Sequence, residues 1–396
     1  MRILMTSYEF PPLGGGGAAV VAGLSRELVA KGHDVDLVTM RFQGNPTHEI
    51  VDGVQVHRVP CWRRFKHVCS APEALTYVVA AGPVVRKLLS SKRFDIVHSH
   101  FILPDGILAW QIRRKTGIPY VVTAHGTDVP GFNPHRVRVA HRLLRPVWHM
   151  VVRSANRIIS PSGVLEQLVH AQGTDSGKTL VIPNGLEVGE YTPHGTAPKV
   201  LVVTRMLERK GVQFLLESLA QSPIAHEVNI VGEGPYLPEL RNQAAASGVR
   251  VKFWGWLENR SPQLRDLYES STIFVFPSEA ENFPIVLLEA MAARLAIITT
   301  AGTGCAEVVG DAALLVPPKD PQAITQALKR LIEEPDFRRS LGVAARRRIE
   351  DKFTWSAVAG LYLEEYARHS TRSDDWAASL PASRGAPRPR DSMLFD

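Results

Sequence analysis

The sequence predicts an α/β fold made of two doubly wound domains that face each other across a cleft. In both halves of the 396-residue chain, short apolar segments alternate with helical patterns. Such alternation is typical of parallel sheets with helices on both faces. Residues 183–198 contain three prolines and three glycines and separate the two series. Ligands are therefore expected between the domains, at the carboxyl ends of the strands.

The first series opens with an expected strand at residues 2–6, which a glycine run follows. A helix is predicted over residues 18–31, with Gly32 as its stop signal. The remaining strands of this series are predicted at residues 34–39, 54–59, 96–99, 119–123, 156–160 and 179–182.

The second series has predicted strands at residues 200–203, 226–231, 251–254, 273–276, 296–299 and 313–316. Two helices are expected after it, over residues 320–349 and 354–368. We assign the first domain to residues 1–190, the second to 191–352 and a terminal helical segment to 353–369. Residues 370–396 are rich in Ser, Arg, Asp, Ala and Pro, and we expect them to form a disordered tail.

Composition limits the classes of function and the compartment. The formal net charge of +7 and the isoelectric point near 9.4 suit anionic substrates or an anionic membrane surface. Nucleic acid is not expected, because zinc-knuckle spacings, aromatic RNA-binding strands and long basic runs are absent from the sequence. Three cysteines without C-x-x-C spacing fit a reducing cytoplasm. The N-terminal segment lacks signal-peptide features, and no apolar stretch reaches about 18 residues, so we expect a cytoplasmic protein.

The stretch PSEAENFPIVLLEAMA, residues 277–292, follows a buried-strand pattern and opens an amphipathic helix. Glu281 is expected on the loop, Pro284 at the first helical position and Glu289 roughly a turn and a half into the helix. A helix N-terminus at the end of a strand favours anions. Two carboxylates beside an anion site imply a ligand that also carries hydroxyl groups, as a nucleotide sugar does. The alternative is an ordinary strand–loop–helix unit with solvated glutamates.

Two cations follow the first strand of the second series. Arg205 comes just past the strand, and Lys210 is expected at the start of the next helix. Together they could clamp a diphosphate, since the arginine fork suits pairs of oxygen atoms. The alternative is a solvated basic loop. Gly232 opens another tight turn at the same sheet edge, for which a plain turn is the simpler interpretation.

The first domain contributes a glycine run and a histidine. Gly14–Gly17 lie between the first strand and the first helix, where such loops commonly meet phosphate, although a simple loop is the alternative. His125 follows a strand and should face the cleft from the opposite side, where it could bind a sugar hydroxyl or the acceptor. We place His100 near the cleft and His98 in packing.

The remaining motifs argue against other chemistry. Asp34-Val35-Asp36 matches a D-x-D pattern, but it begins a strand at the wrong sheet edge, so we interpret it as structural. The sequence has no Gly-x-Ser-x-Gly elbow, His-Glu-x-x-His motif or Walker lysine motif. Hydrolases, metalloproteases and nucleoside triphosphatases therefore lack support.

Together, these residues resemble the family 4 retaining glycosyltransferases of the two-Rossmann (GT-B) type, over about residues 1–368. The similarity is carried by the glycine loop, His125-Gly126, Pro183-Asn184-Gly185, Arg205 with Lys210, and Glu281 with Glu289.

The resemblance implies a role for each candidate residue. Arg205 and Lys210 would hold the donor diphosphate and stabilise the leaving group. Glu289 would bind the ribose, Glu281 would face the donor sugar, and His125 would contact that sugar near the reacting centre. The C-terminal helix after Thr354 would cross back onto the first domain. The predicted catalytic residues are Arg205, Lys210, Glu281 and His125, and the predicted donor-binding residues are Gly15, Gly16, Arg205, Lys210, Gly232, Glu281, Asn282, Phe283, Ile285, Val286 and Glu289.

Two segments depart from the family pattern. The usual Gly-Phe-Gly is replaced by Asn282-Phe283-Pro284, so any amide contact must come from Phe283, Ile285 or Val286. The usual Gly-Gly-x-Pro-Glu turn is replaced by GTGCAE at residues 302–307. The identity of the donor sugar is therefore left open.

These observations lead to a functional hypothesis. The chain would transfer a hexose from a UDP- or GDP-sugar to a hydroxyl acceptor, with retention and without a metal or other cofactor, the nucleotide sugar being a co-substrate. The acceptor would be a lipid-linked glycan, a polysaccharide precursor or a glycoside. The alternatives are a nucleotide-sugar epimerase on the same two-domain plan and a non-catalytic glycan-binding protein.

Two basic segments also suggest contact with an anionic membrane. One contains Trp62, Arg63 and Arg64, and the other runs from Arg136 to Arg153 with Trp148 among its residues. Segments that mix cations with aromatic residues can lie on anionic lipid. The alternative is a solvated basic helix that packs its leucines inward. If lipid binding holds, the inner face of the plasma membrane is a further location.

Overall fold

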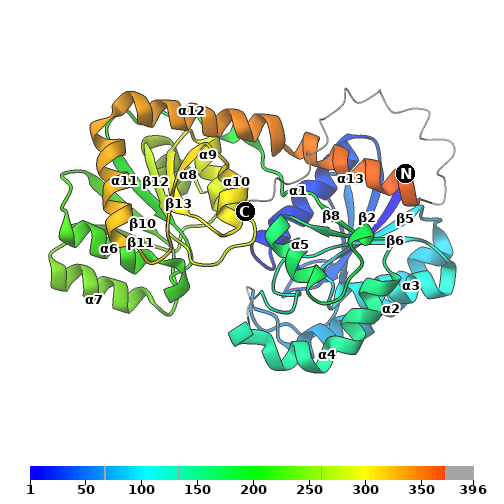
Figure 1. Cartoon of the computed structure of the whole chain (residues 1–396). Helices are drawn as coiled ribbons and strands as arrows, with labels where there is room; N and C mark the ends of the chain where they lie inside the picture. Colours follow the sequence, from blue (N-terminus) through cyan, green and yellow to red (C-terminus); the bar gives the residue numbers. More distant parts are fainter. Residues whose placement is uncertain (67, 133, 260, 371–396) are drawn as a thin grey trace, which may run out of the picture.

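A computed structural model describes residues 1–370 of the chain except residues 67, 133 and 260. The side chains of residues 134–140 and 190 lie outside this description, as do residues 371–396 of the tail predicted at 370–396, whose first residue, Ser370, is described and caps the last helix. Figure 1 shows two α/β units side by side. The predicted fold class, two doubly wound domains of GT-B type, is confirmed.

The first domain is built on an eight-stranded sheet in the order β3-β4-β2-β1-β5-β6-β7-β8, parallel except for the β3–β4 pair. Its helices are α1 (Gly16–Ala30), α2 (Ala71–Ser91), α3 (Asp105–Thr116), α4 (Pro134–Ser154) and α5 (Gly163–His170). Its strands are β1 (Arg2–Thr6), β2 (Asp34–Met40), β3 (His48–Val51), β4 (Val54–Val59), β5 (Ile96–His100), β6 (Tyr120–Thr123), β7 (Arg157–Ser160) and β8 (Thr179–Val181).

The second domain has a six-stranded parallel sheet in the order β11-β10-β9-β12-β13-β14. Its strands are β9 (Lys199–Val203), β10 (Glu227–Val231), β11 (Lys252–Gly255), β12 (Ile273–Phe276), β13 (Ala296–Thr300) and β14 (Ala313–Val316). Its helices are α6 (Val212–Gln221), α7 (Leu237–Ser247), α8 (Pro262–Ser270), α9 (Ile285–Ala292), α10 (Gly304–Val309), α11 (Pro321–Glu333) and α12 (Pro335–Lys352).

The predicted helix over residues 320–349 is wrong, because it is two helices. α11 ends at Glu333, and Pro335 opens α12. Proline lacks the N–H that a continuing helix needs and disfavours helical geometry in the residue before it. The sequence interpretation overlooked this break.

One strand escaped prediction. β3 pairs antiparallel with β4 through a tight turn in which Asp52 and Gly53 have φ angles of 50° and 82°. Asp-Gly is a preferred pair for such two-residue hairpins, because both residues must adopt φ > 0. The dipeptide was therefore a usable signal.

The last helix, α13 (Trp355–His369), leaves the second domain and lies along the first, as the resemblance implied (Figure 1). It completes a core cluster on one face of the first sheet, where Trp355, Val358 and Tyr362 pack with residues of β1 and α1. A Cβ added to Gly23 or Gly185 would lie 2.2 or 2.6 Å from the Trp355 ring. Both positions therefore leave room for the indole only because they are glycines.

The basic segments differ from their predicted arrangement. Arg63 does not face outward: its side chain is 1% exposed and donates hydrogen bonds to the carbonyl oxygens of Phe65 and Lys66. Trp148 is buried, and its indole N–H donates to the Asp128 carbonyl oxygen. Conversely, Leu143 and Leu144 of α4 are exposed, so the alternative in which they pack inward is also wrong. Trp62 and Arg64 remain at the surface, as predicted.

Candidate active site between the two domains

The loop between β12 and α9 holds Glu281 in an ion pair with Lys210. Each of these two side chains is 12% exposed. Ser278 also donates its hydroxyl hydrogen to Glu281 Oε1 at 2.7 Å. Two residues predicted independently, one as a phosphate ligand and one as a sugar ligand, are thus in direct contact.

Backbone packing explains why Lys210 reaches this loop. Lys210 ends a short 3-10 turn, Glu208–Lys210, rather than starting α6 as predicted. Gly211 follows with a φ of 73°, and a Cβ there would lie 2.0 Å from the Pro277 carbonyl oxygen. The turn therefore presses directly against the start of the β12–α9 loop. Arg205 lies just after β9 at the same sheet edge, with an exposed side chain.

Glu289 is half-buried on α9 and accepts a hydrogen bond from the Tyr268 hydroxyl at 2.8 Å. Tyr268 comes from α8, and burial raises the pKa of its phenol well above the usual range. The phenol therefore stays protonated and serves as a donor that orients the carboxylate. Sequence reasoning missed Tyr268, because a tyrosine on the apolar face of a helix looks like any core residue.

The glycine loop of the first domain faces the start of α9. Gly15 caps α1, and a Cβ added there would meet no atom within 4 Å. A Cβ on Gly16 would lie 3.9 Å from the Ile285 side chain. The N-termini of α1 and α9 therefore approach each other across the domain interface. This places Gly15 and Gly16 beside the loop that carries Glu281.

The start of α9 differs slightly from prediction. Pro284 occupies the N-cap rather than the first helical position, and α9 begins at Ile285. Phe283 is buried with its ring 5.6 Å from that of Phe353, so only its backbone can serve a ligand. Ile285 and Val286 are half-buried at the first turn, where backbone N–H groups lack partners within the helix.

Asn282 contacts the first domain instead of facing open space. Ser162, the N-cap of α5, donates its hydroxyl to Asn282 Oδ1 at 2.5 Å. Glu307 of α10 accepts hydrogen bonds from the Gly163 and Val164 backbone N–H groups at 2.7 and 2.9 Å. These contacts join the domains next to Glu281. Ser162 had no distinguishing sequence signal.

The backbone conformation and close packing at Gly232 require a glycine. Its φ is 132°, and a Cβ there would lie 1.8 Å from the Thr204 carbonyl oxygen. A hollow of about 580 Å³ lies beside this turn and is lined by Glu233, Leu237 and Arg241, among others. The hollow and Arg205 share the carboxyl edge of the second sheet.

His125 follows β6 and is fixed by a buried carboxylate and a second histidine. Asp128 accepts hydrogen bonds from the His125 and Gly126 backbone N–H groups at 3.0 and 2.9 Å. The ring nitrogen Nε2 lies 3.2 Å from Nδ1 of His100. Burial lowers the pKa of His125 to about 3. His125 is therefore uncharged at neutral pH.

His98 and His100 occupy the positions that were predicted for them. His98 is buried between β6 and α13, and burial lowers its pKa to about 3. His100 is also buried but touches His125 at the strand end. Asp36 of the D-x-D pattern forms hydrogen bonds with His57 and Lys92 at the far edge, which agrees with a structural role.

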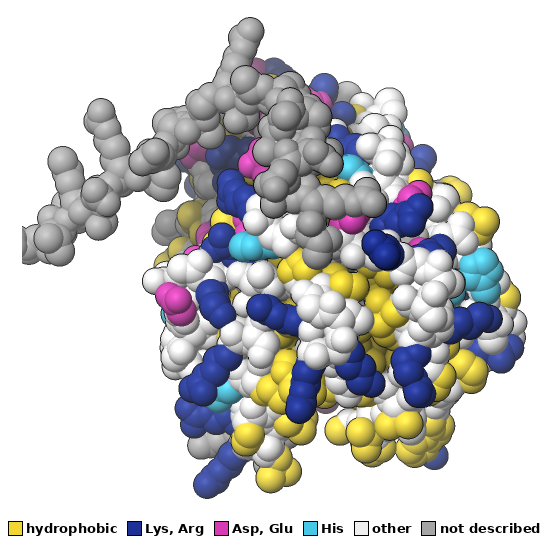
Figure 2. Space-filling model, turned by 90° about the vertical axis from the view of Figure 1, so that its right-hand side faces the viewer, with side chains coloured by type: hydrophobic (Ala, Val, Ile, Leu, Met, Phe, Trp, Pro, Cys, Tyr) yellow, Lys and Arg dark blue, Asp and Glu magenta, His cyan; other side chains and the backbone are white. Residues whose placement is uncertain are grey.

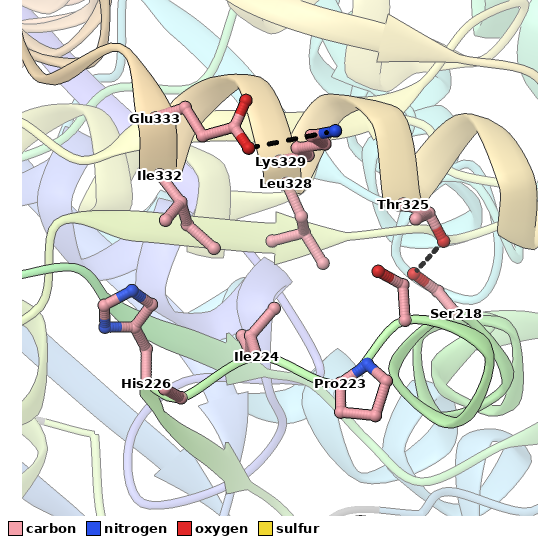
Figure 3. A pocket seen from close by; sticks show the side chains of 11 residues that line it. Ser218, Pro223, Ile224, His226, Thr325, Leu328, Lys329, Ile332 and Glu333 are labelled. Atoms are coloured by element: carbon pink, nitrogen blue, oxygen red, sulfur yellow. Dashed lines mark hydrogen bonds and ion pairs between the residues drawn. The ribbon is translucent and has the colours of Figure 1, made fainter.

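A second pocket, of about 300 Å³, lies between α6 and α11 (Figure 3). Pro223, Ile224 and His226 line it just before β10, so it opens at the amino end of the strands. This is the edge opposite to Arg205 and Glu281. The described ranges contain no group of three or more His, Cys, Asp or Glu residues that could hold a metal ion. None of the helices described combines the length and apolar character needed to cross a membrane.

Comparisons with known proteins extend these observations. The family model "Glycosyl transferase 4-like domain" matches residues 15–185, and "Glycosyl transferases group 1" matches residues 197–334. The uncharacterized glycosyltransferase MJ1607 of Methanocaldococcus jannaschii is 26% identical over 388 residues, covering 91% of this chain and 96% of that protein.

Solved structures support the same architecture. Sucrose-phosphate synthase from Thermosynechococcus elongatus superposes with a TM-score of 0.78 at 22% identity, covering 93% of this chain and 98% of that one. Anabaena Alr3699/HepE, solved in complex with UDP and glucose, gives a TM-score of 0.72 at 17% identity over 92% of this chain and 99% of that one. With both domains matched by glycosyltransferase models, the chain belongs to the family 4 glycosyltransferases with the GT-B fold.

Proposed function

We propose that this glycosyltransferase transfers a hexose from a UDP- or GDP-sugar to a hydroxyl acceptor, with retention and without a metal. One observation carries the proposal. The paired Lys210 and Glu281 lie on the second domain at the edge where Arg205 and Glu289 also stand, and the glycine loop faces this edge. A nucleoside-diphosphate sugar needs both kinds of group, because it offers a diphosphate to cations and hydroxyls to carboxylates.

The Lys210–Glu281 pair suggests how the donor is bound. Lys210 and Glu281 form an ion pair with each other. A diphosphate would draw Lys210 Nζ toward its oxygens, which leaves Glu281 to accept hydrogen bonds from donor hydroxyls. Arg205 would hold a second phosphate oxygen, with the α9 N-terminus adding backbone donors. Glu289, oriented by Tyr268, would accept the ribose hydroxyls.

The reaction we propose is a front-face displacement. The bond from the anomeric carbon to the leaving phosphate oxygen breaks while the acceptor oxygen bonds to the same face of that carbon. The acceptor proton passes to the departing phosphate. Arg205 and Lys210 would stabilise the charge that develops on the nucleoside diphosphate. His125 would contact the donor sugar near the reacting carbon.

The acceptor we propose is carried on an anionic lipid surface, or is itself a lipid-linked glycan. Residues 61–160 contain 16 Lys and Arg residues and only four acidic residues, all four of them buried. Figure 2 shows Lys and Arg side chains spread between hydrophobic ones on this domain, with few acidic side chains on the lower part of the face. Exposed Leu143 on α4, at 74%, and Trp62, at 50%, would insert beside the cations.

Calorimetric titration with UDP, GDP, ADP and NAD tests the donor proposal. One nucleoside diphosphate should bind in the micromolar range, and Glu289→Gln should weaken it. Glu333→Gln at the opposite end of the second domain is the matched control and should bind like wild type. If none of the four nucleotides binds folded wild-type protein, the donor assignment is wrong.

Co-sedimentation tests the membrane proposal. Wild type should sediment with vesicles that contain about one third phosphatidylglycerol and not with pure phosphatidylcholine, and added salt should reduce binding. Leu143→Ser should weaken binding, whereas Val343→Ser, a similarly exposed site on α12 of the second domain, should not. Equal sedimentation with both vesicle types would contradict the proposal.

A further inference from the structure

A buried set of aromatic side chains connects the crossing helix α13 to His125. Tyr366 of α13 lies with its hydroxyl oxygen 2.6 Å from Nδ1 of His98. The rings of His98 and His100 follow, with their centroids 4.1 Å apart. His100 Nδ1 then meets His125 Nε2 at 3.2 Å. His125 is therefore held from behind by the interior of the first domain.

The contact between His100 and His125 needs one proton, which either ring could supply. If His100 donates through Nδ1–H, its Nε2 is a bare acceptor. If His125 donates through Nε2–H instead, neutral His100 must carry its own proton on Nε2. The two arrangements therefore differ in what they place on Nε2 of His100.

The surroundings of His100 Nε2 distinguish these arrangements. Within the described residues this atom is buried and has no hydrogen-bond partner. A buried N–H without a partner costs about 1–3 kcal/mol and is rarer than an under-used acceptor. When His100 donates from Nδ1, the unpartnered atom is instead a lone-pair acceptor, the less rare of the two cases, so we take this arrangement as the favoured one. Neutral His125 must then carry its own proton on Nδ1.

Nδ1 of His125 is turned toward the first helix. A Cβ built on Gly17 would lie 3.6 Å from this nitrogen. Among the hydrogen bonds of the described part of the chain, none uses His125 Nδ1. This nitrogen therefore lies beside Gly17 at the end of the glycine run, with the Phe101 ring, whose centroid is 4.3 Å from that of His125, next to it.

We propose that His100 is a positioning residue, which fixes His125 as the Nδ1–H tautomer so that His125 donates a hydrogen bond to an oxygen of the ligand at the glycine loop. This inference rests on the proposed donor site. It also gives His125 a defined role: with Nδ1 protonated and Nε2 occupied by His100, the ring cannot accept the acceptor's proton. That proton must go elsewhere, which fits its transfer to the leaving phosphate.

At the other end of the set, both ring nitrogens of His98 have hydroxyl partners. When Tyr366 donates to His98 Nδ1, the His98 proton sits on Nε2, 2.8 Å from the Thr123 hydroxyl. Helix α13 thereby helps to hold the histidines that stand behind His125.

Long-range ¹H–¹⁵N correlation NMR on ligand-free protein labelled with [¹⁵N]histidine tests the tautomer directly. His125 should show a protonated Nδ1 and a bare Nε2 at pH 7. His100→Phe keeps a ring in place but removes the donor, so the His125 tautomers should become mixed. His98→Phe leaves the His100–His125 contact intact and should preserve the Nδ1–H form. A protonated Nε2 on wild-type His125 would overturn the proposal.

Replacement of His125 itself adds a functional test. The amide nitrogen of Asn stands near the place of Nδ1, whereas that of Gln stands near Nε2. His125→Asn should therefore retain more activity than His125→Gln, by about two- to tenfold, the worth of one hydrogen bond. The opposite order would contradict a donor at Nδ1. The NMR measurement needs no nucleotide and reports on the His125 tautomer alone. The calorimetric titration reports on the donor, so a failure of one assignment can be told from a failure of the other.

Discussion

The two domains contribute opposite kinds of chemistry to the same interface. The second domain presents charge: Lys210 is paired with Glu281, and Arg205 and Glu289 stand at the same sheet edge. The first domain presents glycine backbone and His125, whose pKa is lowered to about 3 by desolvation, so that it is uncharged at neutral pH. In both domains the loops at the carboxyl ends of parallel strands face the interface, so the difference in charge comes from the residues of these loops.

This contrast indicates a division of labour. In the proposed function, Arg205 and Lys210 of the second domain would bind the donor diphosphate. The histidines of the first domain would supply hydrogen bonds to the reacting sugar without adding charge. Keeping the first edge uncharged also limits the desolvation cost when the two domains approach each other.

The largest expected effect is a loss of stability in the first domain when its contact with α13 is weakened, with no such loss in the second domain. Trp355→Ala should destabilise the first domain by about 3–5 kcal/mol, because truncating a buried tryptophan leaves a cavity. Urea unfolding, followed by limited proteolysis to show which domain opens, measures this. Leu361→Ala on the exposed side of the same helix is the control. Equal stability of the two variants would show that the domain does not need the helix.

Charge on the second domain is tested next. Arg205→Ala should lower kcat by about 10²–10³, the loss typical of removing one donor that stabilises developing charge. Arg265→Ala, an exposed arginine on α8, should leave the rate unchanged. Steady-state kinetics with the donor identified by calorimetry provide the comparison. Unchanged turnover in Arg205→Ala would remove Arg205 from the site.

Neutral histidines should make the first domain sensitive to acid. The pKa values of His98 and His125 fall from 6.5 to about 3 on folding, so the unfolded chain binds more protons between these limits. Stability is therefore lost as pH falls below 6.5, by about 1.4 kcal/mol per pH unit for each histidine.

Urea unfolding between pH 7 and pH 5 measures this loss. His98→Gln should reduce the slope of the unfolding free energy against pH by the equivalent of about one proton, whereas His194→Gln, at an exposed site, should not. Identical slopes in all three proteins would mean that His98 titrates normally in the folded state.

The smallest effect concerns the orientation of Glu289. Tyr268→Phe removes the hydroxyl that donates to this carboxylate and should weaken nucleoside-diphosphate binding by about two- to tenfold. Tyr191→Phe is the matched control, because its ring packs edge-on against Tyr268 at 5.7 Å. Calorimetry at pH 7 separates the two variants. Unchanged affinity in Tyr268→Phe would mean that Glu289 needs no such partner.

Local sequence patterns predicted the fold well, because each buried strand is a short apolar run between turn residues. The errors had local causes: the Glu334-Pro335 break and the Asp52-Gly53 hairpin were both readable but overlooked. The segment carrying Glu281 was also predictable, since its strand, loop and helix follow one another along the chain.

Contacts between distant segments could not be predicted in this way. Tyr268, Ser162 and Tyr366 reach the site from other helices, and nothing in their own neighbourhoods distinguishes them from core or surface residues. Arg63 illustrates the converse error. A basic residue in a basic run looked solvated, but the fold turns its side chain inward to serve backbone carbonyls.

The return of α13 to the first domain has a consequence for synthesis of the protein. Residues 1–190 emerge from the ribosome first, yet one face of their sheet is covered by Trp355, Tyr362 and Tyr366. Until those residues emerge, the nascent first domain exposes the part of this apolar surface that α13 covers in the folded protein. The second domain, by contrast, is built from consecutive elements, β9 to α12, and does not wait for a distant segment. A product truncated before α13 would therefore leave this part of the first core uncovered, and chaperones and proteases could recognise it.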